Sequence, residues 1–190
     1  MDLAFDTVNN AEAAVRWMTQ NGDPIAAGID TLTMLSTGEG GWRPADRWLR
    51  QHYAEVRESV LSPNSLRGAM VVSGLAVLSC LHEINPDILV SETHPKILYS
   101  ELTDGQHYNY AANQAGMNVQ LAQWIGWPVD TTDGHQWDAL ASCLAVWKGG
   151  VCNEWHGDLH NQLHAGQNET LVSIVGPTHY YWPIMPDQVM

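Results

Sequence analysis

The segment Ile25-Ala-Ala-Gly-Ile-Asp30 is a short apolar run that follows Pro24 and ends in a carboxylate. A second run of the same kind, Ile88-Leu-Val-Ser-Glu92, follows Pro86-Asp87 and also ends in an acid. Apolar runs of about four to eight residues, bounded by turn residues, are typical of strands buried on both faces of a sheet. We therefore predict two buried strands that place Asp30 and Glu92 at their carboxyl ends.

Outside these two runs, apolar residues mostly recur at helical spacing. The expected helices cover residues 8–18, 44–56, 62–83, 96–102, 108–124 and 136–148. Residues 171–175 and 179–182 are expected as strands around a Gly176-Pro177 turn, and residues 31–42 as a loop. This alternation predicts an α/β fold with a mixed sheet covered by helices. Because helices outnumber strands, the sheet is expected to be small or to be completed by another chain.

The chain of 190 residues carries 21 Asp and Glu against eight Lys and Arg, a net charge of −13. Such an acidic surface repels polyanions and disfavours sequence-blind coating of nucleic acid. A small phosphate-bearing substrate, a metal-bridged substrate such as a nucleic acid, and a protein partner all remain compatible with it. No apolar run approaches the roughly 18 residues that a membrane span needs, so no membrane partner is expected.

Cysteine usage and the N-terminus indicate a reducing compartment. The three cysteines are odd in number and lack zinc-like spacing: Cys80, Cys143 and Cys152. The first residues lack the basic start and apolar core of a signal peptide. We therefore predict a cytoplasmic protein.

Ligands of open α/β sheets bind beyond the carboxyl ends of the strands, where Asp30 and Glu92 are expected. Asp138 lies about one turn inside a predicted helix, and Asp133 occupies its N-cap. Converging carboxylates repel one another unless a divalent ion such as Mg²⁺ or Mn²⁺ binds between them. The alternative is a local role for each acid: Asp30 as a turn cap, Glu92 paired with an arginine and Asp133 only as an N-cap.

A pattern of arginines accompanies the acids. Arg43, Arg47 and Arg50 share one helical face, which could meet a phosphate group or pair with Asp46 and Glu39 on a solvated surface. We take Arg43 and Arg47 as the candidate substrate-binding residues.

Histidines form the third pattern. His156, His160 and His164 recur every four residues, so they would form one stripe on a helix, and such pairs can bind zinc. Gly157 weakens that helix, and a polar helix face is the favoured interpretation over a zinc site. His135, three residues before Asp138, could orient a water molecule or the carboxylate, and a simple histidine at the helix start is the favoured interpretation.

Four segments together resemble a known family. In order, they are Ile25-Ala-Ala-Gly-Ile-Asp30, Arg43-Pro-Ala-Asp-Arg-Trp-Leu-Arg50, Ser91-Glu-Thr-His-Pro95 and Asp133-Gly-His-Gln-Trp-Asp-Ala-Leu140. This series resembles the domain of unknown function 429 (DUF429), predicted nucleases with a ribonuclease H-like fold. The resemblance covers roughly residues 5–148. It implies that Asp30, Glu92, Asp133 and Asp138 bind Mg²⁺ or Mn²⁺, and that Asp30, Glu92 and Asp138 are catalytic.

The resemblance also carries departures. A ribonuclease H-like fold begins with a three-stranded meander, and this chain is expected to start at the end of its third strand. Thr31-Leu32 replaces a proline turn, and Ala45 replaces a cysteine. We expect a ribonuclease H-like α/β domain at residues 1–150, with residues 151–190 as an extension packed on it.

Two functions follow as hypotheses. The first is a metal-dependent nuclease or phosphodiesterase. The alternative is a non-catalytic, degenerate module that self-associates or binds a protein partner through an open sheet edge.

Overall fold

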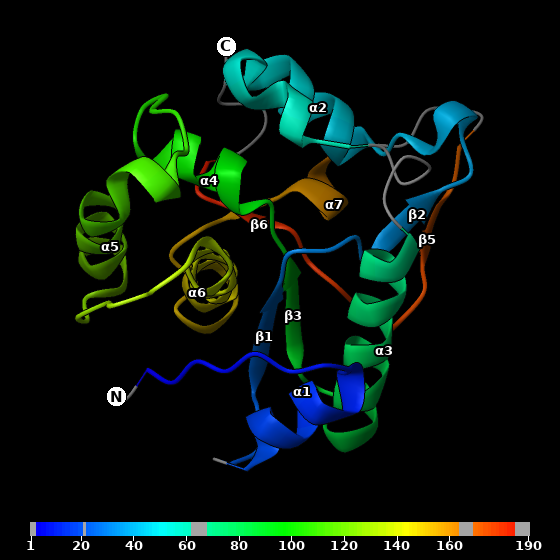
Figure 1. The fold of residues 1–190 in the computed structure, drawn as a ribbon. Coiled ribbons are helices and arrows are strands. Elements are labelled where there is room, and N and C mark those ends of the chain that lie inside the picture. The colour runs from blue at the N-terminus through cyan, green and yellow to red at the C-terminus, as the bar shows by residue number, and fades with distance from the viewer. Residues whose placement is uncertain (1–2, 21, 62–67, 164–168, 185–190) are drawn as a thin grey trace.

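The computed structural model describes residues 3–20, 22–61, 68–163 and 169–184 (Figure 1). The helices are α1 (Ala11–Thr19), α2 (Pro44–His52), α3 (Gly68–Ile84), α4 (Pro95–Leu102), α5 (Tyr110–Ile125), α6 (Gly134–Val146) and α7 (Leu159–Gln162). The strands are β1 (Ala26–Ile29), β2 (Met34–Ser36), β3 (Leu89–Glu92), β4 (Gly157–Asp158), β5 (Leu171–Ser173) and β6 (Tyr181–Trp182). The predicted α/β class is confirmed, with small sheets.

Both apolar runs form strands, and these pair in parallel at the centre of the fold. The register places Ala27 opposite Val90 and Ile29 opposite Glu92. On its other side, β3 contacts the chain at His179, whose amide donates to the Val90 carbonyl at 2.9 Å. The C-terminal part of the chain therefore extends the central strand pair.

Helix α6 lies directly against one face of β1. A Cβ atom at Gly28 would come within 1.9 Å of the Ser142 carbonyl oxygen, so only glycine fits at this contact. Because side chains alternate along a strand, Ala26, Gly28 and Asp30 share this face. The sequence thus brings α6 close to β1 by removing one side chain at the crossing point.

Helices α1 and α3 cover the opposite face, and Figure 1 shows α6 and α3 on opposite sides of the strand pair. The apolar core here joins Val15 of α1, Leu78 and Leu81 of α3 and Val90 of β3. Ala27 and Ile29 pack against the same core. The strand pair is therefore a layer between helices, as the continuous apolar runs predict.

Two further core clusters form on either side of α4. One packs α2 against α4, α7 and β6 and includes Trp48 and Trp182; the other joins α4, α5 and α6 around Trp137. Both are rich in edge-to-face aromatic contacts, such as Trp48 with Trp182 and Tyr99 with Trp137. Much of the chain's tryptophan content thus fills these two cores.

Several predicted boundaries shift. Helix α2 ends at His52, and residues 54–59 form a 3₁₀ segment rather than a continuation of the helix. The predicted loop 31–42 contains β2, which pairs antiparallel with β5. The expected helix start at residues 62–67 lies outside the described residues.

Within the described ranges, no helix is long and apolar enough to cross a membrane.

Candidate functional site

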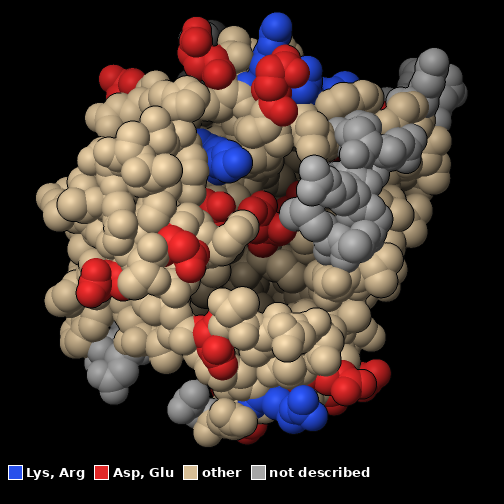
Figure 2. Space-filling model, viewed as in Figure 1, with Lys and Arg blue, Asp and Glu red and all other residues tan. Residues whose placement is uncertain are grey.

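A cavity of about 420 Å³ opens at the carboxyl ends of β1 and β3. Its walls include Asp30, Glu92 and Asp138, the three acids predicted to be catalytic, together with Arg43. Figure 2 shows a hollow in the middle of this face, with acidic side chains inside it and a basic side chain at its rim. The fold therefore gathers distant acids into one place, although their electrostatic states differ.

Asp30 and Asp138 come together because of the contact between β1 and α6. Asp30 lies two residues, about 7 Å along the strand, beyond Gly28 on the same face. Asp138 lies one turn, about 6 Å along the helix, before Ser142, the residue that Gly28 contacts. Both carboxylates thus flank the crossing point and open into the same cavity.

The pKa of each of these carboxyl groups is raised. Burial lifts the pKa of Asp30 from 3.8 to about 6, Lys96 opposes this shift, and the Glu92 charge adds to it. Asp30 is also exposed to solvent on the side that opens into the cavity, so water screens part of this effect. Burial also raises the pKa of Asp138 to about 6, a hydrogen bond from Tyr108 opposes it, and the Asp30 charge adds to it. Near neutral pH this pair therefore carries negative charge at an energetic cost.

Three polar residues surround the pair. Tyr108 donates its hydroxyl hydrogen to Asp138 Oδ1 at 2.8 Å and so fixes that carboxylate. The exposed side chains of Lys96 and His135 line the cavity and attract both carboxylates electrostatically. Neither Asp30 nor Asp138 forms an ion pair with a described residue.

Glu92 is in the opposite state, because Arg43 neutralises it. Arg43 Nη1 and Nη2 donate to Glu92 Oε2 at 2.7 Å and Oε1 at 2.6 Å. The Thr33 amide and hydroxyl donate to Oε2 at 2.8 and 3.0 Å. Burial alone would raise the pKa of Glu92, but the Arg43 charge and the hydrogen bonds from His160 and Arg43 hold it well below its usual value.

Arg43 itself is buried, with 1% of its surface exposed, and it also binds Asp46. Its Nε and Nη2 donate to the two Asp46 carboxylate oxygens at 2.9 and 2.7 Å. One guanidinium group thus holds two carboxylates inside the protein. The predicted substrate-binding role of Arg43 does not fit this arrangement, because its donors are already used within the fold.

The remaining predicted residues lie elsewhere. Asp133 caps α6 by accepting a hydrogen bond from the Gln136 amide at 2.9 Å, and it does not line the cavity. Arg47 is half-exposed, pairs with Glu169 and is also absent from the cavity wall. The local alternatives therefore describe Asp133 and Glu92 correctly, as an N-cap and as an arginine partner.

The predicted histidine stripe is wrong for its described members. His156 precedes β4, whereas His160 lies in the short helix α7, so the two do not share one helix. His160 is buried beside Glu92 Oε2 at 3.4 Å and Thr33 Oγ1 at 3.2 Å. His164 lies outside the described residues.

In the part of the chain that the structure describes, no group of three or more His, Cys, Asp or Glu side chains is arranged to hold a metal ion.

Sequence reasoning missed several residues of this cavity. Lys96 lines the cavity, and Tyr108, outside its lining, holds Asp138; neither belongs to a sequence motif, so only their positions in the fold reveal them. Thr93 and His94 follow β3 and line the cavity, and their buried Thr93 Oγ1 and His94 Nδ1 atoms have no hydrogen-bond partner among the described residues. Their position directly after Glu92, at the end of a predicted strand, could have indicated them, because residues that follow a strand end line the same cavity.

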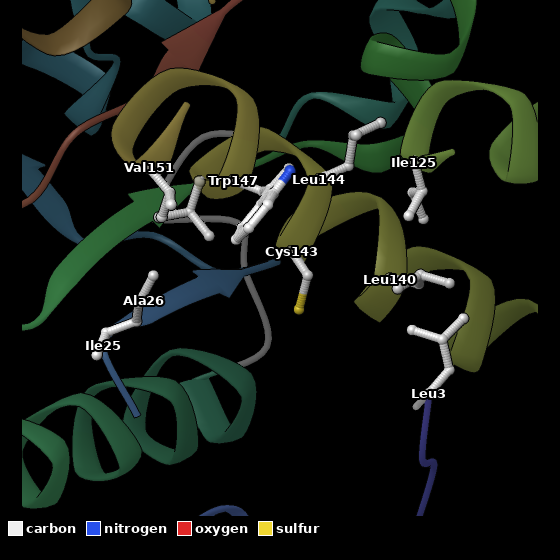
Figure 3. A pocket seen from close by; sticks show the side chains of 10 residues that line it. Leu3, Ile25, Ala26, Ile125, Leu140, Cys143, Leu144, Trp147 and Val151 are labelled. Atoms are coloured by element: carbon white, nitrogen blue, oxygen red, sulfur yellow. The ribbon is translucent and has the colours of Figure 1, made fainter. Parts of the chain in front are cut away.

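A second, apolar cavity of about 280 Å³ lies on the other side of β1 from β3 (Figure 3). Leu3, Ile25, Leu140 and Trp147 surround it, and the Cys143 thiol opens into it. Burial raises the pKa of this thiol, which opposes a nucleophilic role. This cavity offers apolar contact rather than catalytic chemistry.

No protein family, curated protein or solved structure matches this chain. The resemblance to DUF429 therefore stays a prediction from the motifs.

Proposed function

We propose that this chain is a metal-dependent nuclease or phosphodiesterase with a ribonuclease H-like fold, whose reacting centre is the Asp30–Asp138 pair. One observation carries the proposal: two carboxylates share a cavity without an ion-pair partner among the described residues, and the pKa of each is about 6. A divalent cation relieves their repulsion and uses oxygen ligands of the kind they provide.

The residues present fit Mg²⁺ or Mn²⁺ with two protein ligands. Mg²⁺ is commonly bound by one or two carboxylates, and water and substrate phosphates complete its shell. Asp30 and Asp138 meet that requirement, whereas Glu92 does not, because Arg43 and Thr33 occupy its oxygens. Of the four acids that the resemblance implies as metal ligands, the proposal therefore keeps Asp30 and Asp138.

A bound ion would supply positive charge that polarises a phosphate oxygen and lowers the pKa of an attacking water. Tyr108 holds one oxygen of Asp138 and leaves the other free for the ion. Lys96 at the rim is placed to bind a phosphate that enters the cavity. In the same wall, Thr93 Oγ1 is buried and has no hydrogen-bond partner among the described residues, so a small movement of the wall would let it donate to that phosphate.

Cleavage of labelled RNA and DNA, single- and double-stranded, in Mn²⁺ and in Mg²⁺ tests this proposal. Asp30→Asn and Asp138→Asn should each lose at least about 100-fold of the rate, because each removes a ligand charge. Asp133→Asn is the matched control, since asparagine caps helices as well as aspartate and the charge change is the same. No cleavage in any condition, or equal rates in Asp30→Asn and Asp133→Asn, would contradict the proposal.

Metal affinity should also follow the raised pKa values. Binding requires both carboxylates to lose their protons, so Mn²⁺ affinity measured by calorimetry should fall about 100-fold from about pH 7 to about pH 5. Carboxylates with ordinary pKa values near 4 would change that affinity by less than about twofold over the same range. A flat profile would show that this pair is not the metal site.

A second candidate is a non-catalytic module that associates with another copy of the chain. Its support is the apolar cavity beside β1 (Figure 3), where Ile25 is 64% and Trp147 is 38% exposed. Among the described strands, only β3 pairs with β1, so its other side could accept a strand. Light scattering of the wild type and of Ile25→Asp tests this: a dimer that becomes a monomer supports it, and a wild-type monomer removes it.

A further inference from the structure

A third cavity, of about 340 Å³, is lined by three arginines, a tryptophan and a glutamine: Trp42, Arg47, Arg50, Gln51 and Arg57. We call it the arginine hollow. It gathers three of the eight basic residues of a chain whose net charge is −13. No carboxylate is part of its lining. Such a concentration of positive charge marks it as a place for an anion.

Backbone carbonyls hold two of the three guanidinium groups of the arginine hollow, those of Arg47 and Arg50. Arg47 Nη1 donates to the Trp42 carbonyl at 2.9 Å. Arg50 Nη1 donates to the carbonyls of Arg57 and Val60, each at 2.9 Å, and its guanidinium lies 5.0 Å from the centre of the Trp42 ring. Fixed donors lose less conformational entropy when a ligand binds, so Arg47 and Arg50 form a preorganised part of the hollow, beside which the exposed Arg57 can adjust.

Acidic neighbours only partly neutralise these arginines. Glu169 pairs with Arg47, and Glu58 lies 3.1 Å from Arg57 Nε and 3.7 Å from Arg50 Nη2. The Glu58 side chain is 79% exposed, and exposed ion pairs contribute less than about 1 kcal/mol, so an incoming phosphate can displace it. A phosphate can accept two parallel hydrogen bonds from one guanidinium group, whereas Glu58 contacts Arg57 only through Nε.

The arginine hollow adjoins the cavity that holds Asp30 and Asp138. Arg57 lines the hollow, while Glu58 and the following residues through Leu61 line the carboxylate cavity. One short stretch of backbone therefore separates the two. An aromatic ring beside arginines, as Trp42 is here, is the combination that single-stranded nucleic acid sites use for bases and phosphates.

We infer that the arginine hollow binds a phosphate of a single-stranded polynucleotide whose neighbouring segment occupies the carboxylate cavity. This inference rests on the proposed function for the identity of the ligand. It also explains how an acidic protein holds a polyanion: contact is confined to one cationic hollow instead of being spread over the surface. Arg57 is its most informative residue, because its described side-chain partner is the exposed Glu58.

Anisotropy of labelled 12-nucleotide RNA and DNA strands, titrated at several salt concentrations, tests the inference. The titrations use the Asp30→Asn background, in which the strand should stay intact. Adding Arg57→Gln should weaken binding about three- to tenfold and reduce the slope of log affinity against log salt by about 0.7. Adding Arg16→Gln is the matched control, because Arg16 is exposed on α1 and the charge change is the same. The two nucleic acids are separate arms that show whether the sugar matters.

Equal affinity and equal salt slopes in the Arg57→Gln and Arg16→Gln proteins would overturn the inference. So would binding of a mononucleotide as tight as that of the strand, since the strand should fill both cavities. If neither the RNA nor the DNA strand binds at low salt, the inference is also overturned. The binding measurement needs no cleavage. A protein without nuclease activity can therefore still bind the strand through the arginine hollow, and a nuclease that depends on Asp30 can still lack this binding site.

Discussion

Asp30 and Glu92 end two adjacent parallel strands, yet they occupy opposite electrostatic environments. Glu92 is buried against Arg43 and its pKa lies well below the usual value. Asp30 faces the cavity with Asp138, and its pKa is raised to about 6. Two carboxylates at neighbouring strand ends, one residue apart in register, therefore differ: Glu92 is neutralised inside the fold, whereas Asp30 opens into the cavity.

The register of the two strands explains this difference. Glu92 is paired with Ile29 and not with Asp30, and paired residues of parallel strands point to the same face of the sheet. Ile29 faces the core beneath α1 and α3, whereas Asp30 faces α6. Because Asp30 lies one residue beyond the position paired with Glu92, the two side chains point to opposite faces. Glu92 is buried against Arg43, and Asp30 lies beside Asp138.

The largest expected effect comes from removing the buried cation. Arg43→Met leaves Glu92 and Asp46 buried without their partner and should lower the free energy of unfolding by about 3–5 kcal/mol in urea titrations. Changing the acids as well, in the triple variant Arg43→Met, Asp46→Asn, Glu92→Gln, should recover part of that loss. A single variant as stable as the wild type would mean that the cluster is not neutralised in the way described.

The contact between α6 and β1 should come next. Gly28→Ala would place a methyl group within 1.9 Å of the Ser142 carbonyl oxygen, so α6 must move away from β1. We expect a loss of about 1–3 kcal/mol in the free energy of unfolding, as for other overpacked sites. If the pairing of Asp30 with Asp138 depends on this contact, the variant should also lose Mn²⁺ affinity. Ala27→Gly, on the other face, is the control for altered strand composition.

A smaller effect of opposite sign is expected at Asp138. Its pKa rises from 3.8 in the unfolded chain to about 6 in the fold, so the native state holds more protons between these values. Stability therefore decreases as pH rises through this window, and the full penalty remains above pH 6.

Asp138→Asn removes that penalty and keeps an acceptor for Tyr108. The shift corresponds to at most about 3 kcal/mol, and partial solvation of the side chain reduces this to a gain of about 1–2 kcal/mol at about pH 8. Near pH 4 the variant and the wild type should be equally stable. Urea titrations across this pH range measure the difference, and a variant less stable than the wild type at high pH would exclude the raised pKa.

The sequence was sufficient for β1, β3, β5 and β6 and for most helices, because those depend on local periodicity and on breakers such as Pro86 and Gly126. It also indicated that Asp30, Glu92 and Asp138 would share one region, since strand ends meet at one edge of a sheet. It could not choose among their electrostatic states, because these depend on the register of β1 and β3. The α/β class follows from pattern, whereas the ribonuclease H-like fold stays a proposal.

Long-range pairings explain the remaining differences. The loop prediction for residues 31–42 missed β2, because its partner β5 lies more than a hundred residues later in the chain. The histidine stripe assumed one helix, but Gly157 and Asp158 form β4 opposite β6. Neither pairing leaves a local signal, and the weak helix propensity of Gly157 was the one indication against the stripe.

The smallest expected effect on stability is at Arg47, which the sequence places on the same helix face as Arg43. Arg43 and Arg47 both lie at the start of α2 or one turn inside it, but Arg43 is buried and Arg47 is half-exposed beside Glu169. Arg47→Gln should lower the free energy of unfolding by only about 1 kcal/mol, because the Arg47 side chain is 46% exposed and it pairs with one carboxylate, Glu169, whose side chain is 9% exposed, whereas Arg43 is buried and holds two carboxylates. Urea titrations beside Arg43→Met provide the comparison. A loss at Arg47 as large as that at Arg43 would mean that burial does not decide the value of these ion pairs, and the distinction between the structural acid Glu92 and the available acid Asp30 would lose its basis.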